Sequence, residues 1–199
     1  EISSNPNALN QFDNTKIVNA AKLLADAKVN SIAWNGTSAG WLGFDADRKL
    51  CLEIKEATGI ETTTSVLALA EIFTLKKIKK FGLVTPYLDD IQQKIIHNFK
   101  KEGFDCIAEK HLGDKGNFSF SDYKPETIKN MVREVAKSKP EAITIFCTNF
   151  RGGEVVEELE KELNIPIYDT VNITAWKCLK MCNEDTKVIT GWGQLFQDL

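Results

Sequence analysis

The sequence predicts an α/β fold built on parallel strands. Short apolar runs alternate with longer amphipathic stretches along the 199 residues, which is typical of strands that alternate with helices. Polar loops containing Gly, Ser, Thr or Pro follow several of the apolar runs. No long linker or low-complexity segment interrupts the pattern, so these units can form one sheet or two smaller lobes.

The first half of the chain contains three predicted helices. They cover residues 15–28, 45–58 and 65–77, with extended segments over 31–34 and 60–63 and a loop over 35–43. Gly59 is a typical helix stop, and Ser65 can cap the helix that it begins.

The second half repeats the alternation. We expect strands over 80–84, 104–111, 142–146 and 165–168, and helices over 88–102, 125–138, 153–164 and 170–181. A turn covers 85–87, a loop covers 112–123, and 188–190 forms a last strand or a tail segment. Asp89 and Asp90 suit the positive end of their helix, and Pro125 suits a first turn.

Composition narrows the class of protein. The net charge of −3 and the scattered Lys and Arg residues argue against a nucleic-acid surface. No apolar run approaches the roughly 18 residues of a membrane span. Five cysteines without a repeated spacing are typical of reduced thiols, so we expect a cytoplasmic protein. Residues 1–14 are polar and lack a signal-peptide pattern. Because the first convincing element is a helix, we expect that an amino-terminal strand is missing.

The first candidate loop, residues 34–43, follows a predicted strand. Gly36 lets the backbone approach a ligand closely, and Thr37 and Ser38 add hydroxyl donors. This arrangement suits a carboxylate or a phosphate, but it lacks the Gly-Lys-Ser/Thr ending of a P-loop. Taken alone, such a loop is more often a glycine-rich turn with capping hydroxyls.

The second candidate loop, residues 84–90, contains Tyr87. Pro86 fixes the turn, so the phenol can point over the sheet edge as a hydrogen-bond donor. The alternative is a tyrosine that packs on its neighbouring helix.

The third candidate loop begins with Cys147, which ends a buried strand. A thiol at the carboxyl edge of a sheet, beside N–H groups at a helix start, is favoured as a thiolate. Open α/β sheets also bind their ligands at this edge. Cys147 is therefore the strongest candidate for chemistry.

The remaining cysteines and histidines give weaker signals. Cys51 and Cys106 are interpreted as packing residues. Cys178 and Cys182 lie four residues apart without a nearby His or second Cys pair, so no metal site is predicted. His97 and His111 suit structural roles, although a dyad of Cys147 with His111 stays open.

Together the three loops resemble the aspartate/glutamate racemase superfamily, in the branch of maleate cis-trans isomerases and arylmalonate decarboxylases. The resemblance runs from about residue 17 to the end. Its landmarks are residues 36–38, 57–59, 62–65, 85–87, 116–117 and 147–149. It implies two pseudo-symmetric lobes, each with a short parallel sheet flanked by helices, and an active site in the cleft between them. Residues 1–78 and 170–199 would form the first lobe and residues 79–169 the second.

One departure from the family bears on the mechanism. Racemases and maleate isomerases of this family carry one cysteine in each lobe, whereas the first-lobe position is Gly36 here. A glycine can be neither acid nor base. Arylmalonate decarboxylases resemble this sequence, with a glycine in the first lobe and one cysteine in the second.

The resemblance therefore implies a cofactor-independent decarboxylase of malonate-type diacids. Cys147 would be the catalytic proton donor. The groups that would bind the substrate carboxylates are Gly36, Thr37, Ser38, Tyr87, Asn117 and Thr148. No metal or organic cofactor is implied. The expected partner is a small carboxylate or dicarboxylate substrate, with no nucleic acid and no membrane; a monomer and a homodimer both stay open.

Two other functions stay open from the sequence. One is a maleate cis-trans isomerase or an Asp/Glu racemase-like isomerase that uses another group opposite Cys147. The other is a protein that binds a small carboxylate without turning it over.

Overall fold

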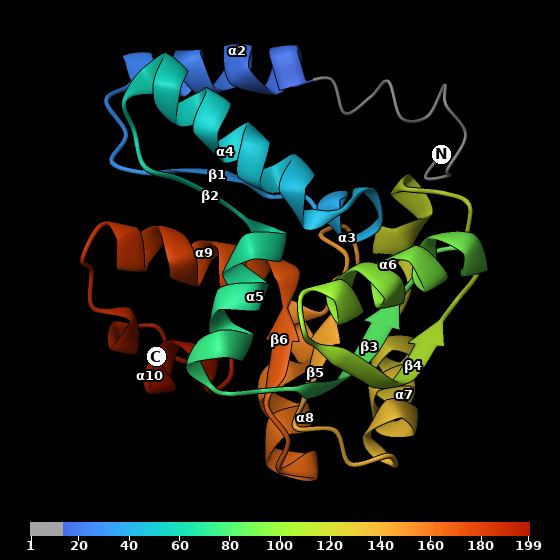
Figure 1. The fold of residues 1–199 in the computed structure, drawn as a ribbon. Coiled ribbons are helices and arrows are strands. Elements are labelled where there is room, and N and C mark those ends of the chain that lie inside the picture. The colour runs from blue at the N-terminus through green and yellow to red at the C-terminus, as the bar shows by residue number, and fades with distance from the viewer. Residues whose placement is uncertain (1–13) are drawn as a thin grey trace.

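A computed structural model describes residues 14–199, which form two parallel sheets with helices packed around them. The smaller sheet has two strands and the larger has four (Figure 1). The predicted fold class is confirmed.

The smaller sheet pairs β1 (Ile32–Trp34) with β2 (Thr62–Thr64) in parallel. In Figure 1, helices α2 (Asn14–Asp26) and α4 (Phe44–Thr58) run above these strands, and α9 (Thr170–Met181) runs below them. A small core of apolar side chains joins the strands to α2 and α4. Helix α9 belongs to the last part of the chain, so both ends of the described chain contribute to this region.

The larger sheet has the strand order β4-β3-β5-β6. Its strands are β3 (Lys80–Thr85), β4 (Asp105–His111), β5 (Ala142–Ile145) and β6 (Ile167–Asp169), all parallel. Helices α6 (Asp89–Lys101), α7 (Pro125–Ala136) and α8 (Val156–Leu163) pack against it. Parallel strands align their carboxyl ends, so the loops after β3 and β5 emerge at one edge.

The main core packs on the larger sheet and extends to α3, α5 and α9, and the small cluster around β1 is separate from it. Helix α5 (Ser65–Leu75) packs on α9 and carries Phe73 into a cluster of aromatic rings with Phe81 and Phe99. Phe99 also contacts Phe146, directly before Cys147. The end of β5 that leads to Cys147 is therefore packed in the hydrophobic core.

Two local predictions are wrong. The expected loop 35–43 contains the short helix α3 (Ala39–Leu42), because the apolar side chain of Trp41 is buried there. The expected loop 112–123 contains the 3₁₀ helix η2 (Phe118–Asp122), which carries Phe120 into the core. For residues 188–190, where a last strand and a tail segment were both open, the structure has no strand. The chain instead makes a 3₁₀ turn, η4 (Thr186–Val188), and a short helix, α10 (Leu195–Asp198), and the hydroxyl of Thr186 donates to the carbonyl of Phe196 at 3.0 Å.

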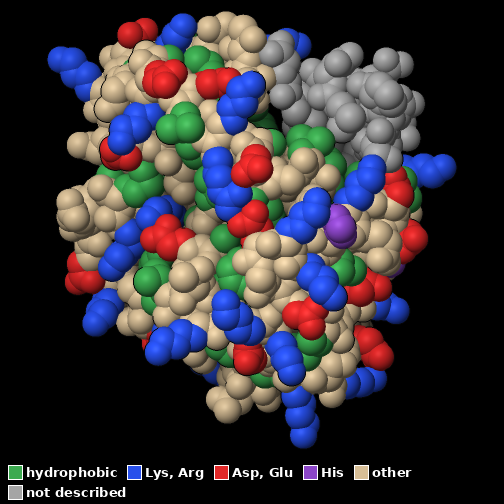
Figure 2. Space-filling view, viewed as in Figure 1, with side chains coloured by type: hydrophobic (Ala, Val, Ile, Leu, Met, Phe, Trp, Pro, Cys, Tyr) green, Lys and Arg blue, Asp and Glu red, His purple; other side chains and the backbone are tan. Residues whose placement is uncertain are grey.

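Other features stay predictions. The expected amino-terminal strand lies outside the described residues, and the lobe boundaries and the homodimer are not tested by this fold. No helix within residues 14–199 combines the length and the apolar character needed to cross a membrane. Where the face seen in Figure 2 is coloured, Lys and Arg are mixed with Asp and Glu.

Candidate active site

The two sheets meet through a buried hydrogen bond between Thr37 and Tyr87. The Thr37 hydroxyl lies 2.7 Å from the Tyr87 hydroxyl, and either oxygen can be the donor. Thr37 follows β1 of the smaller sheet and Tyr87 follows β3 of the larger one. The two side chains are only 5% and 3% exposed. Two of the predicted loops are thus in direct contact.

The Tyr87 ring is held from several sides. Its backbone N–H donates to the Thr85 hydroxyl at 3.3 Å, and its carbonyl accepts from the N–H of Gly113 at 3.1 Å. Trp41 and Phe120 meet the ring edge-on, with centroids 5.3 and 5.6 Å away. The phenol therefore has a fixed orientation toward the smaller sheet.

The loop after β1 leaves no room for a side chain at Gly36. A Cβ atom there would lie 2.6 Å from the Trp34 indole, well inside van der Waals contact. Ser38 precedes α3, but its hydroxyl does not cap that helix. Both Thr37 and Ser38 are buried, so this loop presents hydroxyl groups and no acid or base.

Cys147 lies two residues beyond β5, and its side chain is 2% exposed. The strand continues as far as Phe146, whose N–H donates to the carbonyl of Val84 at 2.8 Å. A turn follows, and helical structure starts only with the 3₁₀ helix η3 (Gly153–Val155) and then α8. The expectation of a cysteine directly at a helix start is therefore wrong.

Burial raises the pKa of the Cys147 thiol to about 11, against the opposing effects of the Tyr87 hydroxyl and the backbone N–H groups of Asn149 and Phe150. The expectation of a thiolate is also wrong, because desolvation outweighs these donors. Burial likewise raises the pKa of Tyr87, and the neighbouring Cys147 adds to that rise. Both groups carry protons near neutral pH.

Asn117 and Thr148 lie at the rim of the loop that begins with Cys147. The Asn149 side-chain amide donates to the Asn117 side-chain oxygen at 2.8 Å and to its carbonyl at 3.2 Å. Asn117 is exposed and Thr148 is half-buried. The structure joins these residues to the third loop, and it does not place either of them in the contact of Thr37 with Tyr87.

Sequence reasoning did not single out Asp169, which ends β6 beside β5. Its carboxyl is buried, and burial raises its pKa to about 7. The sequence feature that could have identified Asp169 is its position directly after the strand predicted over 165–168. Aromatic side chains near these loops differ in their surroundings: Trp41 and Phe120 pack on Tyr87, whereas Phe118 is 83% exposed.

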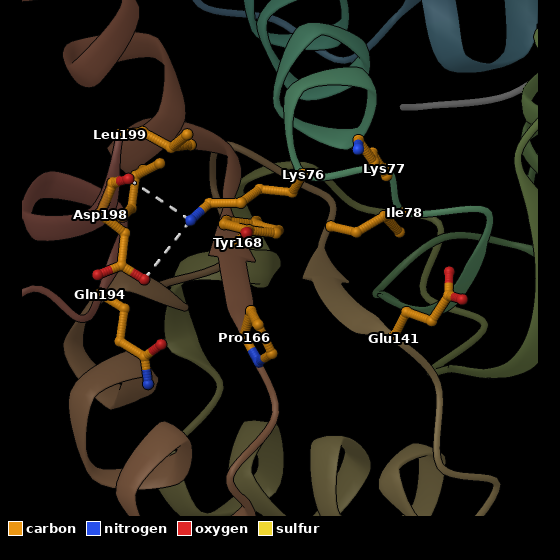
Figure 3. Close-up of a pocket in the computed structure, with 10 residues that line it drawn as sticks. Lys76, Lys77, Ile78, Glu141, Pro166, Tyr168, Gln194, Asp198 and Leu199 are labelled. Atoms are coloured by element: carbon orange, nitrogen blue, oxygen red, sulfur yellow. Dashed lines mark hydrogen bonds and ion pairs between the residues drawn. The ribbon is translucent and has the colours of Figure 1, made fainter.

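A cavity of about 310 Å³ lies at the opposite edge of the larger sheet (Figure 3). Ile78, Glu141 and Pro166, which precede β3, β5 and β6, line it. The Lys76 ammonium group lies 3.6 Å from the Asp198 carboxylate in this cavity. The cavity is thus separate from the thiol, which follows the far end of the sheet. Among residues 14–199, no group of three His, Cys, Asp or Glu side chains is arranged to hold a metal ion.

Two small parallel sheets flanked by helices, with a buried cysteine after a strand of the larger sheet, match the α/β architecture that the family resemblance implies. The sequence model described as arylmalonate decarboxylase matches residues 8–196. The chain belongs to this family, and the predicted superfamily branch is confirmed.

Two curated relatives agree with this assignment. Arylmalonate decarboxylase of Bordetella bronchiseptica is 20% identical over 185 residues, which cover 92% of this chain and 77% of the relative. Maleate isomerase of Pseudomonas putida is 21% identical over 179 residues, which cover 86% of this chain and 71% of the relative.

Solved structures share the fold. A crystal structure of arylmalonate decarboxylase matches with a TM-score of 0.85 and 20% identity, covering 94% of this chain and 83% of the other. A Nocardia farcinica maleate cis-trans isomerase variant matches with a TM-score of 0.87 and 20% identity, covering 98% and 82%. That isomerase variant carries a covalently bound succinylcysteine intermediate.

Proposed function

We propose that this enzyme is a cofactor-independent decarboxylase of malonate-type diacids in which Cys147 is the single proton donor. The observation that carries the proposal is the contrast between the two strand-end loops. One presents a buried, protonated thiol, and the other presents hydroxyl groups beside a glycine. An acid on one face only suits the protonation of a carbanion from one side.

The reaction would begin with loss of one carboxylate as CO2. The bond between that carboxyl carbon and the α-carbon breaks, and its electron pair passes into the remaining carboxylate to form an enediolate. One hydroxyl of the Thr37–Tyr87 pair would donate to the enediolate oxygens while the other donates to its partner. The hydroxyl of Ser38 and the backbone N–H groups of Cys147 and Thr148 would be the further donors. Donors that are already oriented stabilise such charge without reorganisation.

The second step would be proton transfer from the Cys147 thiol to the α-carbon. A new C–H bond forms as the S–H bond breaks, and solvent returns the proton to sulfur after the product leaves. The raised pKa of Cys147 supports this role, since the acid must be protonated before each turnover. The closely packed surroundings of the thiol also support it, because a dry site weakens the solvation of the leaving carboxylate.

A maleate isomerase is the second candidate, favoured by the isomerase relative and by the covalent cysteine adduct of the Nocardia farcinica variant. By the family resemblance, that chemistry needs a nucleophilic cysteine in the first lobe, and this chain has Gly36 at that position. The decarboxylase is therefore the better-supported proposal. Incubation with maleate discriminates between the two, because only an isomerase releases fumarate.

The decisive experiment is Cys147→Ala assayed for CO2 release from phenylmalonate and alkyl-substituted malonates. We expect turnover to fall by about 10²–10⁴-fold, the usual contribution of a positioned general acid. In heavy water the wild-type product should carry one deuterium at the α-carbon.

The matched control is Cys106→Ala, which removes a half-buried thiol from β4 away from the loops and should leave the rate unchanged. Full activity of Cys147→Ala would contradict the proposed acid role.

A further inference from the structure

Asn35 lies at the carboxyl end of the smaller sheet, directly before Gly36. The strand register pairs Trp34 with Thr64, so Asn35 and Ser65 follow their strands side by side. Ser65 is the first residue of α5, and its hydroxyl donates to the Asn35 side-chain oxygen at 3.1 Å. Asn35 is exposed on a tight turn, in which the N–H of Gly36 donates to the carbonyl of Trp34 at 3.0 Å. One end of an exposed amide is therefore fixed to the edge of the sheet.

The Ser65 hydroxyl is in turn held by helix α9. The Thr174 hydroxyl lies 2.8 Å from the Ser65 oxygen and 2.7 Å from the carbonyl of Thr170, and it has a single hydrogen. In an α-helix the Thr170 carbonyl already accepts the backbone N–H of Thr174, whereas no other donor among residues 14–199 reaches the Ser65 oxygen. Thr174 therefore donates to Ser65, and Ser65 donates to Asn35. This direction leaves the NH₂ group as the free end of the Asn35 amide.

The chain of hydrogen bonds ends at the junction of the two sheets. Its two hydroxyls are buried where α5 packs on α9. Helix α9 begins directly after β6, and the hydroxyl of Thr170 in its first turn donates to the carbonyl of Ile145 in β5 at 3.5 Å. Cys147 follows Ile145 by two residues. Asn35 is thus linked to the side of the junction from which the loop with Cys147 leaves.

The equivalent position in the larger sheet is apolar. Phe146 precedes Cys147 as Asn35 precedes Gly36, and the Phe146 ring is buried in the main core. The smaller sheet instead has an exposed amide whose orientation depends on two buried hydroxyls. Hydroxyls between packed helices have a desolvation cost that apolar side chains do not. Their effect here is to orient a side chain that the core does not need, which favours a role in binding a ligand.

We propose that Asn35 is a further substrate-binding residue, and that Ser65 and Thr174 are positioning residues that fix its orientation. The Asn35 NH₂ group would donate to the carboxylate that the substrate retains through the reaction, beside Thr37 and Ser38. An NH₂ group suits a carboxylate because it only donates, and hydrogen bonds to charged acceptors are the stronger ones. This inference rests on the proposed function for the class of ligand, a small diacid.

The test is the affinity of the Cys147→Ala protein for phenylmalonate, measured by isothermal titration calorimetry. This background is used because it should bind the diacid with little turnover. Adding Asn35→Ala should weaken binding at least about tenfold, since the lost hydrogen bond is to a charged group. Asn35→Asp keeps an acceptor for Ser65 and puts a carboxylate oxygen in place of the NH₂ group. It should therefore weaken binding more than Asn35→Ala does.

Ser65→Ala tests the positioning role in the same background. Alone it should weaken binding about threefold to tenfold, and combined with Asn35→Ala it should add no further loss, because the amide that it orients is gone. Thr174→Val is the second variant, in case Ser65→Ala disturbs folding, and it should behave in the same way. The matched control is Thr186→Val, which removes a buried hydroxyl that donates to the carbonyl of Phe196. It should leave the affinity unchanged.

The outcomes separate this inference from the proposed reaction. Equal affinity with and without the Asn35 amide overturns the inference, and so does a full additional loss from Ser65→Ala when Asn35 is already alanine. If the wild type releases no CO2 from any malonate but Asn35→Ala still weakens diacid binding, the proposed reaction is wrong and the inference is supported. If the folded protein binds none of phenylmalonate, malonate and maleate, both are wrong.

Discussion

The loops that follow β1 and β5 share a local sequence pattern but present different chemical groups. Each ends a short parallel strand and carries a threonine after a small residue, Gly36 in one and Cys147 in the other. Thr37 is buried against Tyr87, whereas Thr148 is half-buried at the rim. The threonine of the pattern thus supplies a buried hydroxyl after β1, and the residue before the threonine supplies a thiol after β5. The two loops therefore differ in the chemistry of their side chains, whereas each follows the end of a short parallel strand.

Removing the two threonine hydroxyls separately tests whether the two loops have different functions. Thr37→Val should lower kcat by about 10²-fold, because it removes one oxyanion donor and the partner of the Tyr87 hydroxyl. Thr148→Val should change kcat by less than about threefold, since only its backbone N–H is assigned a role. Steady-state rates with phenylmalonate measure both. Similar losses in the two variants would mean that the loops are functionally equivalent.

The second test makes the loops alike by Gly36→Cys. We expect decarboxylation to fall at least about tenfold, because the new Cβ collides with the Trp34 indole and displaces Thr37. No maleate isomerisation should appear. Adding Trp34→Leu to this variant should recover part of the lost rate by removing the indole. Isomerase activity in the single variant, measured as fumarate formed from maleate, would show that the glycine alone sets the reaction.

The sequence predicts the loops better than their surroundings. Residues such as Gly36, Thr37, Tyr87 and Cys147 can be found because a strand end followed by a turn is a local pattern. The contact of Thr37 with Tyr87 joins positions fifty residues apart. The family resemblance implied that both residues belong to one site, but their hydrogen bond to each other was not predicted.

The protonation state of the Cys147 thiol could not be predicted from a local sequence pattern. A cysteine before a helix predicts a thiolate, but the chain makes a turn first and buries the sulfur, so the sign of the effect reverses. Burial and the packing of Trp41 and Phe120 on Tyr87 depend on the whole fold. Asp169 was missed for the same reason, since an aspartate at a helix start is usually an exposed cap.

Each of the two regions also contains a buried carboxyl group, Asp47 in one and Asp169 in the other. Of the substitutions considered, we expect Asp47→Asn to have the smallest effect on catalysis. Burial raises the pKa of Asp47 from an ordinary value of 3.8 to about 7, and the Thr64 hydroxyl opposes part of that rise. The folded chain therefore binds this proton more tightly than the unfolded chain. Its contribution to stability is complete below about pH 4 and is lost as the pH rises through about 7. The difference is worth at most about 4 kcal/mol, at about 1.4 kcal/mol per pKa unit.

Asp47→Asn should therefore raise the Tm at pH 8 by several degrees and change it little at pH 5, with kcat within about twofold of the wild type. Part of the decline in Tm between pH 5 and pH 8 should remain, because the raised pKa of Asp169 acts in the same direction. Asp45→Asn is the control on the same helix turn, since that side chain is 95% exposed. Thermal unfolding by circular dichroism measures all three chains. A lower Tm for Asp47→Asn at pH 8 would mean that Asp47 makes a stabilising contact as a carboxylate, and the two buried acids would then differ in charge state as well as in place.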